Sequence, residues 1–293
     1  MARASRTMRI GEAERLLLRE YGRMAAVYDR HSITSATVVW NEIRKRLPNI
    51  RGRRALDLCC GPGAHTVRLA RVIGPAGSVD GIDAARGMIE FARRRHGAGS
   101  RSNLKFERMD SRSLRYPARS FDFVLSAFGV SFLAPEQALR EVFRVLGKGG
   151  SFLYVSWAGA NPESKAFLEA LAELRHRRPS LPDVRRLALA RQVVSNFPAN
   201  RHRGREPTLA TKLRGVGFRQ IRRVVRPVTV RFRNPGAYVQ YKATWGEYDR
   251  DLGRLSRGEK MRFVEDVARR MRWFRGGRAP RVTWSLCFTT ATR

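Results

Sequence analysis

The stretch that decides the fold reads Ala55-Leu56-Asp57-Leu58-Cys59-Cys60-Gly61-Pro62-Gly63. Its apolar first half predicts a buried strand, and a helix is predicted to begin at Ala64. Gly61 and Gly63 allow the backbone to turn tightly and to approach a ligand with no Cβ in the way. The helix offers free N–H groups at the same point. Alone, such a loop fits any nucleotide-binding fold.

Short apolar strands and helices alternate after this loop, which predicts right-handed crossovers and a mostly parallel sheet covered on both faces. An α/β fold is therefore expected. The expected strands are 55–59, 78–82, 104–109, 121–126 and 151–157, and the expected helices are 64–73, 85–95 and 136–146.

The flanking segments are predicted to be mainly helical. Two helices, 11–29 and 35–46, precede the alternating region, and Pro48 ends the second. After residue 158, Pro227 is expected to separate two strands, because proline cannot donate to a sheet ladder. These strands are 221–225 and 228–232, the helices lie within 162–195 and at 236–248 and 257–274, and the closing strand is 282–290.

Acidic residues follow the strands at informative spacing. Asp83 ends the second strand about 20 residues after the loop, where a carboxylate can accept both hydroxyls of a ribose. Asp110 ends the third strand, and Asp122 opens the fourth. The ends of neighbouring parallel strands converge on one crevice, so the sequence predicts a ligand site at this edge of the sheet.

Four runs in order resemble the class I S-adenosylmethionine-dependent methyltransferases, in particular the group that includes quinone-biosynthesis C-methyltransferases. The runs are DLCCGPGAHTVRLA, VDGIDAARGMIEFAR, FERMDSRSLRYPARSFDFVLSAFGV and LREVFRVLGKGGSFLYVSW. The resemblance implies a Rossmann-like, seven-stranded sheet and S-adenosyl-L-methionine as cofactor. It also implies a helical lid at 1–50 and a methyltransferase domain at 51–293, with a cofactor-binding half at 51–158 and substrate-side insertions at 159–205 and 234–280.

The resemblance also implies roles for individual residues. Asp57, Gly61, Pro62 and Gly63 would cradle the amino-acid and ribose parts of the cofactor, with Cys59 where most relatives have Gly. Asp83 would hold the ribose hydroxyls. The remaining expected contacts are Met88 beside the adenine, Asp110 accepting from its amino group, Ser111 through its backbone, and Ala127 and Phe128 beneath the sulfonium.

The substrate end is less defined. Tyr28 and His31 are the catalytic candidates, and Phe132 and Trp157 are expected to line the pocket together with Phe128. Ala25-Ala26-Val27-Tyr28-Asp29 is similar to the lid motif of the group. The quinone enzymes continue with a Met-Asn pair where Arg30 and His31 follow here, which puts a quinone acceptor in doubt.

The composition is strongly basic, with 59 Lys and Arg against 25 Asp and Glu, a net charge of +34. Such a field attracts nucleic acid, anionic lipid or phosphorylated substrates, although a general arginine bias explains it equally well. Three cysteines cannot form a four-ligand zinc site, so no metal is expected. A reducing, cytoplasmic location is expected, because no secretory signal or membrane-spanning run is evident.

The basic residues are densest near two predicted strands. Residues 201–233 hold 11 basic groups and one acid, and the alternation puts guanidinium groups on one strand face. The leading hypothesis is a methyltransferase acting on a small, lipophilic or anionic molecule. The alternatives are an RNA methyltransferase and a catalytically idle, RNA-bound assembly factor. The residues proposed to contact RNA or an anionic surface are Arg219, Arg222, Arg223, Arg231 and Arg233.

Overall fold

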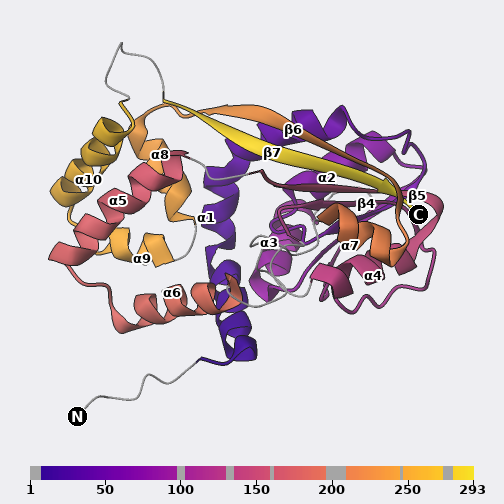
Figure 1. Cartoon of the computed structure of the whole chain (residues 1–293), viewed down its shortest axis with the longest axis horizontal. Coiled ribbons are helices and arrows are strands. Elements are labelled where there is room, and N and C mark those ends of the chain that lie inside the picture. The colour runs from indigo at the N-terminus through magenta and orange to yellow at the C-terminus, as the bar shows by residue number, and fades with distance from the viewer. Residues whose placement is uncertain are drawn as a thin grey trace.

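The computed structural model describes residues 8–97, 103–129, 135–158, 162–195, 209–244, 247–272 and 280–293, apart from the side chains of 31–35, 135, 162–163, 195 and 247. Its centre is a seven-stranded sheet in the order β3-β2-β1-β4-β5-β7-β6 (Figure 1). β1 to β5 are parallel, and β7 runs antiparallel to both of its neighbours. The strands are β1 Arg54–Leu58, β2 Ser78–Asp83, β3 Leu104–Arg108, β4 Phe121–Ala127, β5 Leu146–Trp157, β6 Arg219–Arg231 and β7 Arg281–Thr292.

Helices cover both faces of this sheet, as the sequence predicted. In β4, Phe123 and Leu125 join one buried cluster while Val124 between them joins the other. This alternation is the period of two of a strand buried on both sides. The helices are α1 Ile10–Arg44, α2 Ala64–Ile73, α3 Arg86–His96, α4 Pro135–Val145, α5 Pro162–Arg177, α6 Pro182–Ser195, α7 Leu209–Val216, α8 Pro235–Ala243, α9 Glu247–Gly253 and α10 Arg257–Arg270.

The N-terminal segment is one helix, α1, and the prediction of two helices was wrong. Residues 30–34 contain neither Pro nor Gly, so nothing in the backbone interrupts the helical hydrogen bonds between the two predicted halves. In Figure 1, α1 stands between the sheet and a group of helices formed by α5, α8, α9 and α10. The helix contacts α3 and β6 on the sheet side, and α6 and α8 among the later helices.

α1 crosses α3 with the two backbones in contact. A Cβ on Gly87 of α3 would lie 2.5 Å from the carbonyl oxygen of Gly22 in α1, and a Cβ on Gly22 would lie 3.1 Å from the amide nitrogen of Gly87. No side chain fits at the first position without moving backbone atoms. Two glycines therefore set how closely α1 approaches the carboxyl end of β2.

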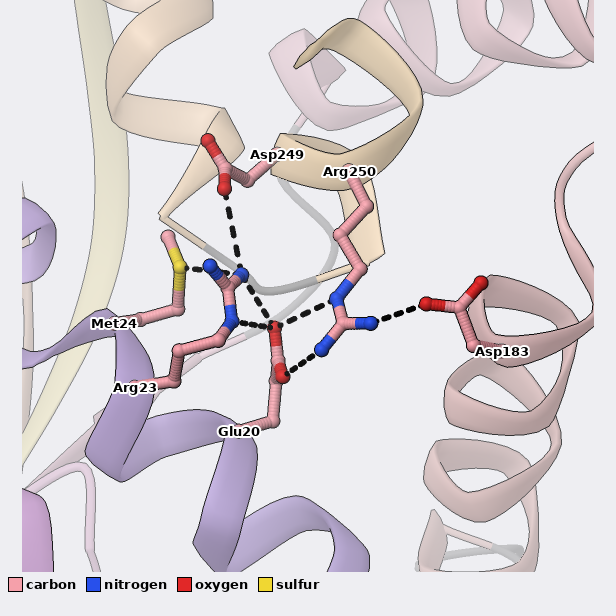
Figure 2. A network of polar contacts seen from close by, with 6 residues as sticks. All are labelled: Glu20, Arg23, Met24, Asp183, Asp249 and Arg250. Carbon is pink, nitrogen blue, oxygen red and sulfur yellow. Dashed lines mark hydrogen bonds and ion pairs between the residues drawn. The ribbon is translucent and has the colours of Figure 1, made fainter. Parts of the chain in front are cut away.

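A buried carboxylate joins α1 to the later helices (Figure 2). Glu20, only 6% exposed, accepts hydrogen bonds from Arg23 at 2.6 Å and from Arg250 of α9 at 2.7 Å. Arg250 also pairs with Asp183 of α6, and Arg23 reaches Asp249 at 3.3 Å. Burial acts to raise the pKa of Glu20, but the hydrogen bonds and charges of the two arginines lower it overall. The network ties three helices together through one ionised side chain.

β6 is a single strand, so the expected break at Pro227 was also wrong. In the part of the chain that the structure describes, β6 is an edge strand that pairs with β7 alone. An edge strand tolerates proline because one side of it has no ladder partner. Within the described ranges, no helix has both the length and the apolar character needed to cross a bilayer.

The loop after β1 contains three left-handed residues: Cys59 at φ 60°, Gly61 at φ 56° and Gly63 at φ 91°. Only Cys59 carries a side chain there, and this conformation costs a non-glycine residue about 1–2 kcal/mol. The thiol side chain packs against the chain after β4, because a Cβ on Gly129 would lie 2.2 Å from the Cβ of Cys59. The loop and the end of β4 are therefore fitted to each other.

Replacing Gly87 by Ala should lower the free energy of unfolding by about 1–3 kcal/mol, since the new methyl group forces α1 away from α3. Gly215→Ala in α7 is the matched control, because a Cβ at that helical position meets nothing within 4 Å. Urea unfolding of the three proteins measures the difference. Equal stability of Gly87→Ala and wild type would contradict the close packing.

Cys59→Gly should stay within about 1 kcal/mol of wild type, because the relief of backbone strain offsets the lost packing. Cys59→Val should lose about 2 kcal/mol or more, since a β-branched residue fits a positive φ poorly and meets Gly129. Thermal unfolding followed by circular dichroism compares them. A valine variant as stable as the glycine variant would show that Cys59 does not need this conformation.

Candidate functional site

The loop after β1 forms the floor of the site. The Gly63 amide donates to the carbonyl oxygen of Cys60 at 3.1 Å and closes the turn ahead of α2. A Cβ on Gly61 would meet nothing within 4 Å, so this side of the loop is open. A Cβ on Gly63 would lie 2.7 Å from the ring of Phe106, so this glycine is required by packing. Gly61 thus leaves its side of the loop free of neighbouring atoms, while Gly63 fits the loop against β3.

Asp83 joins the loop to the next helix. One carboxylate oxygen accepts from the Gly61 amide at 3.0 Å, and the other accepts from the Ala85 amide at 2.9 Å. Burial raises the pKa of this carboxyl, and the two amides oppose the increase. Because each carboxylate oxygen has two acceptor positions, one on each oxygen remains available. The sequence placed Asp83 at this edge correctly.

Asp57 lies beneath the loop. It is 1% exposed, and one carboxylate oxygen accepts from the Thr66 hydroxyl of α2 at 2.7 Å. Burial raises its pKa to about 7, the Thr66 hydrogen bond opposes this, and the nearby charge of Asp83 adds to it. The contact that the structure describes for Asp57 therefore holds the loop to α2. Its predicted contact with a cofactor stays a prediction.

A cavity of about 310 Å³ opens at the other end of the site, where β2 and β3 finish. Asp110, the residue expected to recognise an adenine amino group, lines this cavity, and its carboxylate is bound by Arg112, with Nη2 and Oδ2 2.6 Å apart. Ser111 lies within hydrogen-bonding reach of the Cys59 thiol. The cavity is lined by Leu18, Ala84, Arg108, Met109, Asp110 and Arg115.

Aromatic rings follow β4 on the opposite side of the loop. Phe128 has a left-handed backbone, φ 65°, and donates its amide to Val155 of β5 at 2.9 Å. Its ring centroid lies 4.9 Å from that of Trp157, and Trp157 packs edge-on against Trp284 of β7. Ala127 contacts the same buried cluster. The predicted residues Phe128 and Trp157 are therefore brought together.

α1 forms the roof. Met88 is buried against Ala25 of α1, and Leu18, Tyr21 and Tyr28 pack around this pair. Burial raises the pKa of Tyr28 to about 12, with smaller contributions from the charges of Tyr21 and Asp83. Its phenol is therefore neutral near pH 7. The side chain of His31 and the whole of Phe132 lie outside the described residues.

Three polar residues at the site were missed at the sequence level. Ser126 of β4 is fully buried, and its hydroxyl has no hydrogen-bond partner among the described residues. His65, at the start of α2, stacks on Trp40 at 6.1 Å, and its buried Nδ1 also lacks such a partner. Arg112 is the third. His65 stands two residues after Gly63, so its closeness to the loop could have been predicted from the sequence. Nothing in the sequence around Ser126 or Arg112 points to a role at the site.

The family described as a methyltransferase domain matches residues 55–150. The demethylmenaquinone methyltransferase of Staphylococcus aureus is 36% identical over 115 residues, which is 38% of this chain and 46% of that protein. The chain thus spans about half the length of the curated relatives it matches. Neither comparison favours an RNA substrate.

Two solved structures share the fold. The YcgJ protein of Bacillus subtilis has a TM-score of 0.51 at 19% identity, covering 88% of this chain and 98% of that one. Phosphoethanolamine N-methyltransferase 2 of Haemonchus contortus, in complex with S-adenosyl-L-methionine, has a TM-score of 0.51 at 16% identity and covers 87% and 52%. Residues 55–150 therefore match a methyltransferase-domain family, and the chain as a whole shares the Rossmann-like fold of class I methyltransferases.

Proposed function

We propose that the protein is an S-adenosylmethionine-dependent methyltransferase acting on a small, lipophilic molecule. The observation that carries the proposal is the convergence of the open loop at Gly61, the Asp83 carboxylate and the cavity at Asp110 on one edge of the sheet. This edge is where open α/β sheets bind nucleotides. The match of the methyltransferase-domain family to residues 55–150 supports the same reading.

The residues of this edge fit the cofactor. The two free acceptor positions of Asp83 correspond to the two hydroxyls of a ribose, and Asp110 offers an acceptor to the adenine amino group. The loop Cys59-Cys60-Gly61-Pro62-Gly63 would let the amino-acid part of the cofactor lie against its backbone. Asp57 holds this loop in place from below through its hydrogen bond with Thr66. Ala127 and Phe128 would lie beneath the sulfonium, which supplies the methyl group.

The acceptor side is proposed to be apolar. The rings of Phe128 and Trp157 are partly buried and lie 4.9 Å apart, and the buried rings of Trp284 and Tyr241 continue the stack behind them at 5.3 and 5.6 Å. The first two rings offer an apolar wall suited to a flat, lipophilic molecule. The similarity to the demethylmenaquinone methyltransferase of Staphylococcus aureus supports a substrate of this class. The lid differs from the quinone enzymes at Arg30 and His31, so the proposal stops at a lipophilic acceptor.

The lid and the later helices are proposed to close this space. Residues 1–50 would act as the lid, and the insertions at 159–205 and 234–280 would form the substrate side. Tyr28 is neutral near pH 7, so it would donate a hydrogen bond to the acceptor rather than remove a proton. His31 is the remaining candidate for a base.

The basic edge of the sheet is proposed to dock on an anionic lipid surface, where a lipophilic acceptor resides. Arg222, Arg223 and Arg231 of β6 are exposed, and that strand carries no acidic residue. Val225 between them is 52% exposed, so an apolar side chain accompanies the guanidinium groups. Arg219 and Arg233 flank the patch and are also exposed.

For the cofactor, calorimetry should show S-adenosylhomocysteine binding to wild type, and Asp83→Ala should weaken it at least about tenfold because the ribose loses its acceptor. Asp122→Ala is the control, since Asp122 opens β4 at the opposite end of the sheet and accepts from the Arg54 amide. An unchanged affinity in Asp83→Ala would remove Asp83 from the site. Radiolabelled cofactor with fractionated extract then tests whether the label enters lipid, RNA or small molecules.

For the surface, changing Arg222, Arg223 and Arg231 to Gln should weaken binding to phosphatidylserine vesicles about 100-fold at low salt, at about 1 kcal/mol per arginine. The same loss of charge at Arg257, Lys260 and Arg262 of α10, all exposed, should matter much less. Vesicle sedimentation at two salt concentrations measures both. Equal losses in the two variants would leave only a general charge effect, and retention of bulk RNA instead of vesicles would favour the RNA alternative.

A further inference from the structure

The first turns of α1 form one side of the cavity at Asp110. Leu18 of this helix lines the cavity together with Ala84, which follows β2, and Met109, which follows β3. α1 is therefore one wall of the space in which an adenine ring would lie. The position of this wall depends on what holds the N-terminal part of α1 in place.

Arg112 fixes the carboxylate of Asp110. Its Nε lies 3.0 Å from Oδ1 and 3.1 Å from Oδ2, and its Nη2 lies 2.6 Å from Oδ2. The Arg112 amide adds a fourth contact to Oδ1 at 2.8 Å. Burial acts to raise the pKa of Asp110, but Arg112 lowers it overall, so the carboxylate is ionised near pH 7. Arg112 thus sets both the charge and the orientation of this acceptor.

The same guanidinium holds α1. Nη2 of Arg112 pairs with Oε1 of Glu14, and Nη1 lies 3.4 Å from Oε2. The side chains of Arg112 and Glu14 are 25% and 19% exposed, so water screens the pair only in part. Glu14 lies one helical turn before Leu18. One arginine therefore joins the adenine acceptor to the helix that roofs the cavity.

The contacts with Arg112 do not occupy every hydrogen-bond acceptor position of the Asp110 carboxylate. A carboxylate has about four acceptor positions, and the Arg112 amide and Nε take those of Oδ1. Nη2 takes one position of Oδ2, with Nε sharing it at longer range. The Asp110 side chain is 39% exposed, so its remaining position is accessible from the cavity. A ligand amino group can bind there without breaking the pairs.

The other arginines at the cavity have different partners. Arg115 donates to Glu107 at 2.6 Å and to the carbonyl of Arg108 at 3.0 Å. Arg108 donates to the carbonyl of Ala84 at 3.2 Å. Neither shows a described contact with α1, so the link to the roof is specific to Arg112.

From this geometry we infer that Arg112 is a positioning residue, which orients Asp110 toward the 6-amino group of the adenine and, through Glu14, keeps α1 closed over the bound cofactor. The inference rests on the proposed function. It assigns two effects to one side chain: selection of the amino group through Asp110, and slow release of the ligand through Glu14. The two effects are separable, since replacing Glu14 removes the link between Arg112 and α1 but leaves the contacts between Arg112 and Asp110 in place.

The test uses S-adenosylhomocysteine and S-inosylhomocysteine, in which a carbonyl oxygen replaces the 6-amino group. Surface plasmon resonance gives the dissociation rates, and the ratio of the two affinities gives the preference for the amino group. Glu14→Gln should raise the dissociation rate about 5-fold while keeping the preference, in line with one partly exposed charged pair. Arg112→Met should raise the rate at least as much and also reduce the preference about 5-fold or more, because Asp110 loses its orientation.

Glu12→Gln is the matched control, since Glu12 lies on the same helix but pairs with Arg186 of α6. It should leave both quantities unchanged. Hydrogen exchange of residues 10–24 provides a readout independent of turnover: the ligand should slow exchange there in wild type and much less in Glu14→Gln.

The outcomes distinguish a failure of the proposed function from a failure of the role assigned to Arg112. If wild type binds neither ligand, the proposed function fails and the role of Arg112 fails with it. If wild type binds and Glu14→Gln matches it in dissociation rate and exchange, only the role of Arg112 in closing α1 is overturned. If Arg112→Met keeps the full preference for the amino group, its role in orienting Asp110 is overturned.

Discussion

The backbone contact between Gly22 and Gly87 is the constraint on which the rest of the site depends. Because neither residue has a side chain, α1 lies directly on α3, immediately after the strand that ends in Asp83. This closeness lets Leu18 wall the cavity and brings Tyr28 and Met88 into one buried cluster. A wider separation would leave the strand ends open to water, and no polar contact of α1 could then form at its present length.

The acids of α1 explain how a strongly basic chain keeps this helix in place. Glu14 and Glu20, both mostly buried, pair with arginines of the loop after β3 and of α9. Removing one partner of a buried ion pair leaves a charge without compensation, which is more costly than the pair itself is stabilising. Part of the arginine excess is therefore structural. The exposed arginines of β6 show no described ion pair with the acids of α1 and remain the part suited to an external anion.

The sequence predicted the parallel sheet and the positions of Asp83 and Asp110 because these depend on local patterns: apolar strands, glycines and acids at regular spacing. It did not predict the continuous α1, although neither Pro nor Gly stands between the two predicted helices. It also missed Arg112, whose partner Glu14 lies 98 residues away along the chain. No spacing rule connects two such residues; only the packing of α1 on α3 brings them together.

The position of β7 has a consequence for folding during synthesis on the ribosome. β7 lies between β5 and β6 in the sheet, but it is synthesised after both of them. Among the described strands, β7 is the one partner of β6. Until residues 281–292 have emerged, β5 is an open edge with unsatisfied backbone groups and β6 has nothing to pair with. The basic, proline-containing sequence of β6 would hinder its pairing with other nascent chains during this interval. The residues that now face solvent would thus also protect the unfinished sheet.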